Sequence, residues 1–97
     1  MSSYCILGKF TDQGIRAIKQ SPKRLDSSRD LAKSMGAEVK AFHLAMGRFD
    51  FLVMLEAPSE EIAARFVLAL SSQGNVRTTT LKIFDETQYR GIIGKLP

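Results

Sequence analysis

The segment Met46-Gly47-Arg48-Phe49-Asp50 constrains the fold most strongly, because an apolar-rich run lies on each side of it. Residues 39–45 precede the segment and residues 51–55 follow it, a pattern typical of two antiparallel strands joined by a tight turn. Glycine suits the first central position of a type II′ turn, which predicts a two-residue loop of Gly47 and Arg48. The sequence therefore predicts a β-hairpin with strands over about 37–46 and 49–56.

The two-residue loop also predicts the register of the hairpin and the face on which each side chain lies. In this register the pairs are Met46 with Phe49, Leu44 with Phe51, Phe42 with Val53, and Lys40 with Leu55. These side chains form a strongly apolar face, which is expected to meet the helices. The opposite face is mixed but half apolar, and it holds Val39, Ala41, His43, Ala45, Asp50, Leu52, Met54 and Glu56.

Further runs along the chain predict the other two strands. Residues 4–10 and 76–84 are rich in β-forming side chains. Together with the helices described next, they complete the order β-α-β-β-α-β, which is the ferredoxin-like or split-βαβ pattern. We therefore expect one α+β domain over residues 1–97, in which helices cover one face of a four-stranded antiparallel sheet.

Helix signals occupy the segments between the strands. A first helical region is broken near Pro22, where Ser21 is expected to cap its second part. Gly36 lies where a C-cap glycine belongs. A second helix is expected to begin after its N-cap, Ser59, and to end at Gly74. The tail after residue 84 is compatible with one more short helix.

The face of the sheet opposite the helices is open in this fold, and in a monomer such a face is mostly polar. Here it is half apolar, and it covers roughly 24 by 19 Å, on the order of 450 Å². This area approaches the largest apolar patch of a typical monomer. We therefore expect the open face to pack on a second copy, which makes the protein a homodimer or a higher homo-oligomer.

Composition narrows the class of protein. The chain is 44% apolar and 25% charged, as in ordinary globular domains. Its one cysteine, Cys5, permits no intrachain disulfide and is expected to be a small buried side chain in a reducing compartment. Apolar runs of membrane-spanning length and a signal-peptide pattern are both lacking, so the expected location is cytoplasmic, without membrane contact.

The net charge of +4 comes mainly from basic residues between positions 16 and 33. Aspartates interleave with them, and Asp26–Arg29 and Asp30–Lys33 have the i,i+3 spacing of ion pairs on a helix surface. We interpret this segment as a solvated helical face. A nucleic-acid partner is not expected, because such a binder presents its basic residues as a stripe.

His43, the only histidine, is the first candidate for catalysis. In the expected register it lies diagonal to Asp50 on one face, at about 7–8 Å, which is within reach of long side chains. Oriented by Asp50, it would act as a general base or proton relay near neutral pH. The alternative is a histidine hydrogen-bonded in an interface or core, with Asp50 capping the turn.

Other side chains are candidates for ligand binding. Lys9, Arg48 and Arg77 are candidates for an anion site, although the sequence does not show whether they converge. Thr78 is interpreted as a strand residue, with its hydroxyl as a candidate ligand contact. The amphipathic sheet and the lack of a dense catalytic cluster favour a small organic ligand. One histidine and one cysteine make no metal cluster, and no Walker or dinucleotide motif is present. Neither a metal nor a cofactor is therefore expected.

The ordered set of short motifs resembles the GYD family of small prokaryotic proteins over nearly the whole chain. The likeness rests on Leu7-Gly8-Lys9-Phe10-Thr11 with Gly14, Ser21-Pro22 with Arg24, Met46-Gly47-Arg48-Phe49-Asp50, Val53-Met54-Leu55-Glu56-Ala57-Pro58 and Gly74-Asn75-Val76-Arg77-Thr78. The family takes its name from Gly, Tyr and Asp; Gly47 and Asp50 match, whereas Phe49 replaces the tyrosine. The resemblance implies a ferredoxin-like fold similar to the dimeric α/β barrels, and it implies no particular reaction.

Three functions are consistent with these features. The first is a homo-oligomeric accessory protein or a binding protein for a small organic ligand. The second is a cofactor-independent oxygenase or isomerase that uses His43 and Asp50. The third is a purely structural assembly domain. An enclosed cavity lined by His43 or Asp50 would favour the enzyme, whereas a place at a dimer seam would favour the other two.

Overall fold

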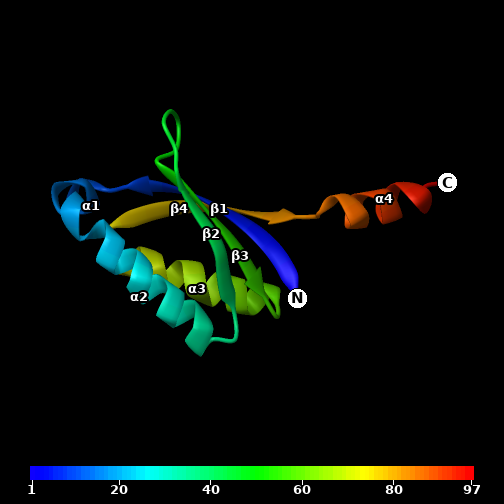
Figure 1. Cartoon of the computed structure of the whole chain (residues 1–97), viewed down its shortest axis with the longest axis horizontal. Coiled ribbons are helices and arrows are strands. Elements are labelled where there is room, and N and C mark those ends of the chain that lie inside the picture. Colours follow the sequence, from blue (N-terminus) through cyan, green and yellow to red (C-terminus); the bar gives the residue numbers. More distant parts are fainter.

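The computed structural model describes residues 1–97 and contains one antiparallel sheet with the strand order β2-β3-β1-β4 (Figure 1). The strands are β1 (Ser2–Phe10), β2 (Glu38–Leu44), β3 (Phe51–Ala57) and β4 (Val76–Ile83). The helices are α1 (Asp12–Arg16), α2 (Ser21–Ser34), α3 (Glu60–Ser72) and α4 (Glu86–Gly94), and a 3-10 turn, η1 (Ile18–Gln20), joins α1 to α2. Helices α2 and α3 lie on one face of the sheet, so the predicted α+β ferredoxin-like fold is confirmed.

Local signals set most helix boundaries as expected. The hydroxyl of Ser59 accepts a backbone hydrogen bond in the first turn of α3 and begins that helix. Gly36 follows α2 with φ +78°, a conformation that favours glycine. The prediction that Ser21 caps a helix is wrong, because η1 runs directly into α2. Gln20 is the N-cap there, without a side-chain hydrogen bond.

The register of the β2–β3 hairpin is as expected near the loop and shifts at a bulge further along. The observed pairs are Leu44 with Phe51, His43 with Leu52, Phe42 with Val53, Ala41 with Met54, and Val39 with Leu55. The shift lies between Val39 and Ala41, so Lys40 does not pair with Leu55 as predicted. A bulge leaves one residue outside the ladder, and it turns the following residues to the other face. Val39 is therefore buried against the helices and does not lie on the open face.

The loop of the hairpin is wider than the predicted two-residue turn. The N–H of Ala45 donates to the carbonyl oxygen of Asp50 at 2.8 Å, which makes residues 46–49 the loop. The predicted pair of Met46 with Phe49 does not form, because β2 ends at Leu44 and β3 begins only at Phe51. The four-residue loop leaves the predicted pairing of Leu44 with Phe51 unchanged, so each side chain keeps its predicted face near the loop.

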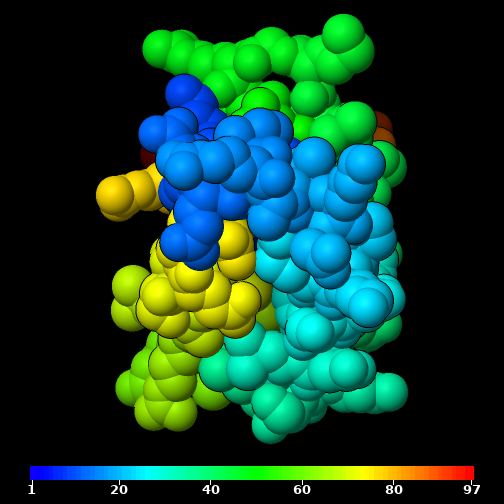
Figure 2. All heavy atoms as spheres, turned by 90° about the vertical axis from the view of Figure 1, so that its left-hand side faces the viewer, coloured from blue at the N-terminus to red at the C-terminus, as the bar shows by residue number.

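The tip of the hairpin stands clear of the body (Figure 2). Met46 is 97% exposed and Leu44 is 73% exposed, although the alternation predicts that both face the helices. The reason is length, because the hairpin extends beyond the end of the helical layer. The helices therefore cover the hairpin only as far as Phe42 and Phe51, and the residues between these two project beyond the helices.

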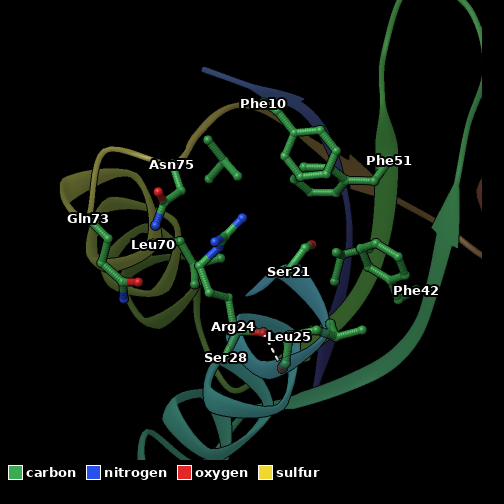
Figure 3. Close-up of a pocket in the computed structure, with 12 residues that line it drawn as sticks. Phe10, Ser21, Arg24, Leu25, Ser28, Phe42, Phe51, Leu70, Gln73 and Asn75 are labelled. Carbon is green, nitrogen blue, oxygen red and sulfur yellow. Dashed lines mark hydrogen bonds between the residues drawn. The ribbon is translucent and has the colours of Figure 1, made fainter. Parts of the chain in front are cut away.

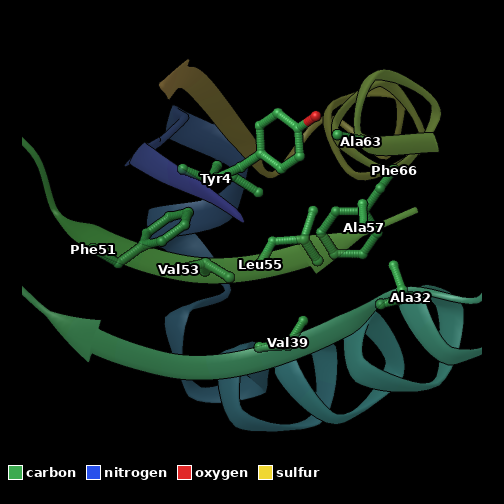
Figure 4. Close-up of a cluster of buried hydrophobic side chains, with 11 residues drawn as sticks. Tyr4, Ala32, Val39, Phe51, Val53, Leu55, Ala57, Ala63 and Phe66 are labelled. Carbon is green, nitrogen blue, oxygen red and sulfur yellow. The ribbon is translucent and has the colours of Figure 1, made fainter. Parts of the chain in front are cut away.

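The core lies between the sheet and helices α2 and α3 (Figure 4). Its largest fully buried side chains are Ile6 from β1, Leu55 from β3 and Phe66 from α3. The smaller or less buried members are Tyr4, Ala32, Ala37, Val39, Phe51, Val53, Ala57 and Ala63. Burying one large apolar side chain stabilises a fold by about 1.5–3 kcal/mol. The side chains packed between the sheet and the two helices therefore supply most of the hydrophobic driving force for folding.

The hydroxyl of Tyr4 is buried in this core without a hydrogen-bond partner. An unpartnered buried hydroxyl costs about 1–3 kcal/mol of desolvation. We therefore expect Tyr4→Phe to raise the free energy of unfolding by about 1 kcal/mol, measured by thermal unfolding. Tyr89→Phe is the control, because Tyr89 lies exposed on α4 and should show no change. A destabilised Tyr4→Phe variant would contradict this assignment.

The basic segment of α2 behaves differently from the expected pattern of ion pairs. Neither Asp26–Arg29 nor Asp30–Lys33 forms an ion pair. The guanidinium of Arg29 instead donates to the carbonyl oxygen of Val39 at 3.1 Å. It thereby ties α2 to β2 at the bulge, where the strand ladder is interrupted.

The face of the sheet away from α2 and α3 carries no helix. Alternation along the strands places Cys5, Leu7, Leu52, Met54 and Leu81 together on this open face. Cys5 is half-buried there and not fully buried as expected. The apolar side chains shield one another from solvent only in part, and Leu81 remains 45% exposed.

Helix α4 extends away from the rest of the molecule, and it accounts for the long axis of 52 Å (Figure 1). A capping box of Asp85 and Gln88 begins the helix. Its apolar side chains are all exposed, namely Tyr89, Ile92 and Ile93, with Leu96 after its end. None of the helices has the length and hydropathy needed to cross a lipid bilayer.

Candidate functional site

The first candidate pair, His43 and Asp50, is not joined by a hydrogen bond or an ion pair. His43 is exposed on the open face beside Leu52. The carboxylate of Asp50 accepts a hydrogen bond from the N–H of Phe10 at 2.9 Å. The N–H of Asp50 donates to the carbonyl oxygen of Gly8 at 2.8 Å. Asp50 therefore fastens the base of the hairpin loop to the end of β1.

This contact predicts a structural effect of replacing Asp50. A hydrogen bond to a charged group contributes about 1.5–3 kcal/mol, so Asp50→Ala should lower the free energy of unfolding by about 2 kcal/mol. Urea denaturation followed by circular dichroism measures this change. Asp26→Ala is the control, because Asp26 is exposed on α2 and has no partner in the structure. Equal stabilities of the two variants would show that the Asp50 contact contributes nothing.

The three candidate binding residues do not converge on one point. Thr78 pairs with Gly8 and shares its face of the sheet, toward the helices. Lys9 is the next residue along β1 and lies on the opposite face. Its ammonium group lies 5.9 Å from the ring centroid of Phe49 in the hairpin loop. Arg48 is exposed at the tip of that loop.

A cavity of about 70 Å³ lies where α2, the end of α3 and the sheet meet (Figure 3). One wall is aromatic: the ring of Phe51 lies 5.3 Å from that of Phe10 and 5.6 Å from that of Phe42, between centroids. The side chain of Arg24 enters the cavity from α2. Asn75, just before β4, lies across the cavity from the aromatic wall. The cavity is mostly apolar, with a few polar groups at its rim, as in most sites for small ligands.

Arg24 is the residue of this cavity whose role the sequence pattern concealed. Its place among the basic residues of α2 predicts a solvated side chain, yet its guanidinium turns inward and donates to the carbonyl oxygens of Ala17 and Gly14. The available signal was helical spacing, because Ser21, Arg24 and Ser28 recur at three and four residues and so share one face of α2.

No group of three or more histidine, cysteine, aspartate or glutamate side chains has a geometry that would hold a metal ion.

Comparison with known proteins identifies the family of the chain. The model of the GYD domain matches residues 4–93. The chain belongs to the GYD domain family. A curated relative from Thermus thermophilus is named "Glutamine synthetase and cystathionine beta-lyase binding protein". It is 31% identical to this GYD-domain chain over 83 residues, which cover 84% of the chain and 87% of the relative.

The residues of the GYD signature have structural roles in this family member. Gly47 has φ +131°, in the left-handed region that favours glycine, and so allows the loop to turn. Asp50 ties the loop to β1. Phe49, at the tyrosine position, provides the ring that the ammonium group of Lys9 approaches. The signature therefore builds the projecting hairpin tip.

Proposed function

We propose that this GYD-domain protein is an accessory protein that self-associates through the open face of its sheet and binds an enzyme. The observation that carries the proposal is the amount of apolar surface that the chain leaves unpartnered, on the open face, on α4 and at the hairpin tip. The name of the Thermus relative, a binding protein for two enzymes, supports the same class of function. No observation favours an oxygenase or isomerase, because the carboxylate of Asp50 is engaged with the backbone of β1.

The accessible surface of the chain is larger than a monomer of this size needs. It measures 6724 Å², whereas a compact 10.8 kDa monomer exposes about 5,500 Å². A stable interface of standard size buries about 800 Å² on each partner. The surplus of about 1,200 Å² is therefore enough for one such interface on each chain.

The open face is the surface that best fits a second copy. Its centre is apolar, with Leu7, Leu52 and Met54 in adjacent strands. Burying such side chains stabilises by about 25 cal/mol for each Å² removed from water. Helix α4 begins after β4 and extends away from the body, so its exposed apolar side is free to contact a second copy as well. His43 would then lie at the seam of the dimer.

We expect light scattering to show a dimer or larger oligomer at tens of micromolar. Leu52→Lys should raise the dissociation constant at least tenfold, a loss of about 1.4 kcal/mol or more, because the ammonium group would be buried in an apolar seam. Leu68→Lys is the control: Leu68 lies exposed on α3, on the other side of the molecule, and its replacement should leave assembly unchanged. A wild-type monomer at this concentration would overturn the proposed self-association.

The hairpin tip is the proposed contact for the enzyme partner. Leu44 and Met46 are largely exposed there, and Arg48 adds a charge that can make directional hydrogen bonds. Exposed apolar residues rimmed by polar groups mark interaction sites. Because the tip stands clear of the body, it can contact a partner while the open face is occupied by a second copy.

The decisive experiment uses purified glutamine synthetase and cystathionine β-lyase from the organism that encodes this chain. Calorimetry should show a complex with at least one of them, with a dissociation constant of about 10 μM or lower. The double variant Leu44→Asp, Met46→Asp should weaken that complex at least tenfold, whereas Leu68→Asp should not. Lack of a complex with either enzyme at about 100 μM would overturn the assignment of these partners.

A further inference from the structure

We propose that the cavity between α2, α3 and the sheet binds a small monocarboxylate, with its carboxylate on the guanidinium of Arg24 and its carbon atoms against Phe10, Phe42 and Phe51. The cavity is distinct from the open face and from the hairpin tip. The inference therefore stands independently of the proposed accessory function.

The charge of Arg24 has no counter-ion in the chain. Its guanidinium donates to the carbonyl oxygens of Ala17 at 3.1 Å and Gly14 at 3.4 Å, and it takes part in no ion pair. A guanidinium has five N–H donors, so these two bonds orient the group and leave donors for a ligand. A half-buried cation beside an apolar wall attracts a single negative charge more strongly than an exposed one does.

The walls of the cavity indicate the rest of the ligand. Phe42 stacks on Phe51 and Phe10 packs against Phe51 at a tilt of 42°, which gives an aromatic wall across the cavity from Arg24 (Figure 3). The hydroxyl of Ser21 is half-buried at the rim and makes no hydrogen bond in the chain, so it can donate to a second oxygen atom. One cation, one hydroxyl and an aromatic wall suit a monocarboxylate with a short apolar part.

The size of the cavity limits the length of that apolar part. A cavity of about 150 Å³ holds benzene, and one water molecule takes up about 30 Å³ in the liquid. The 70 Å³ here therefore accommodates a group of a few non-hydrogen atoms. An apolar part of one to three carbon atoms, as in acetate, propionate and butyrate, fits this space with the carboxylate at the rim on Arg24, whereas a nucleotide or a sugar phosphate would have to remain largely outside. A phosphate dianion would also need more donors than Arg24 and Ser21 supply.

The test is an NMR titration of the whole protein with acetate, propionate and butyrate. The matched probes are propionamide, which has the shape of propionate without the charge, and inorganic phosphate. Propionate should produce saturable shifts at the backbone amides of Phe10, Arg24 and Asn75, with a dissociation constant in the millimolar range. Propionamide and phosphate should bind at least tenfold more weakly.

Arg24→Gln should weaken propionate binding at least tenfold, whereas Arg16→Gln, at an exposed position on α1, should not. If Arg24→Gln does not fold, the comparison of propionate with propionamide on the wild-type protein still decides the outcome. Equal binding of the acid and the amide, tighter binding of phosphate, or the lack of any saturable shift at about 100 mM would each overturn the proposal.

Discussion

Phe66→Ala is expected to lower the free energy of unfolding by about 3–5 kcal/mol, because it removes the largest fully buried side chain of the core. Phe66 has no exposed surface, and it projects from α3 into the centre of the core (Figure 4). Its removal loses the transfer free energy of the ring and leaves a cavity that the rigid sheet cannot fill. A small domain has about 5–15 kcal/mol of stability, so this variant should be partly unfolded near body temperature. Urea denaturation followed by circular dichroism measures the loss.

Leu68→Ala provides the matched control for Phe66→Ala. Leu68 lies two residues further along the same helix but is 68% exposed. Exposed substitutions away from special features change stability by no more than about 0.5 kcal/mol. Comparable losses in the two variants would mean that α3 does not pack on the sheet as described.

Gly8→Ala is expected to lower the free energy of unfolding by about 3 kcal/mol, although it adds only one methyl group. Gly8 pairs with Phe51 across β1 and β3, and a Cβ atom at residue 8 would clash severely with Cζ of the Phe51 ring. The ring cannot swing aside easily, because it packs between Phe10 and Phe42. Overpacking of this kind forces side chains from their rotamers or shifts the backbone. Thermal unfolding measures the effect.

Two further variants distinguish a steric clash from a general intolerance of alanine. Gly91→Ala adds the same methyl group in α4, where no atom lies within 4 Å, and it should raise helix stability by up to about 1 kcal/mol. Gly8→Ala combined with Phe51→Leu should lose less than the two single losses together, because the smaller side chain relieves the clash. Strict additivity in this pair would contradict the steric explanation.

The parts of the fold that the sequence predicts well are those governed by local chemistry. Ser59 begins a helix because its hydroxyl satisfies a backbone donor of the first turn, and this depends on a few adjacent residues. The alternation around Leu44 and Phe51 likewise predicts the register near the loop. The bulge at Lys40 escaped prediction because the alternation near the loop gives no sign that the register changes further along the strand. The observed pairing of Val39 with Leu55 buries Val39 in the core that α2 shares.

The candidate site was harder to predict because its contacts join distant parts of the chain. Asp50 shares a face with His43 in the hairpin, but its carboxylate turns to the N–H of Phe10, forty residues earlier. The N–H of Phe10 lies outside residues 39–55, so the alternation in that segment could not predict this hydrogen bond. The cavity at Arg24 combines α2, the end of α3 and the sheet, so no single segment carries its signature.

The bulge at Lys40 also restricts how copies of the chain can add to one another. Strand β2 is an edge of the sheet, and an unprotected edge invites pairing with the strand of another molecule. The bulge interrupts the row of free backbone groups, and the charged Lys40, which approaches Glu38 and Glu56 at 3.7 and 3.6 Å, adds a polar barrier. The same residue that interrupts the ladder therefore disfavours continuous pairing of further strands along this edge.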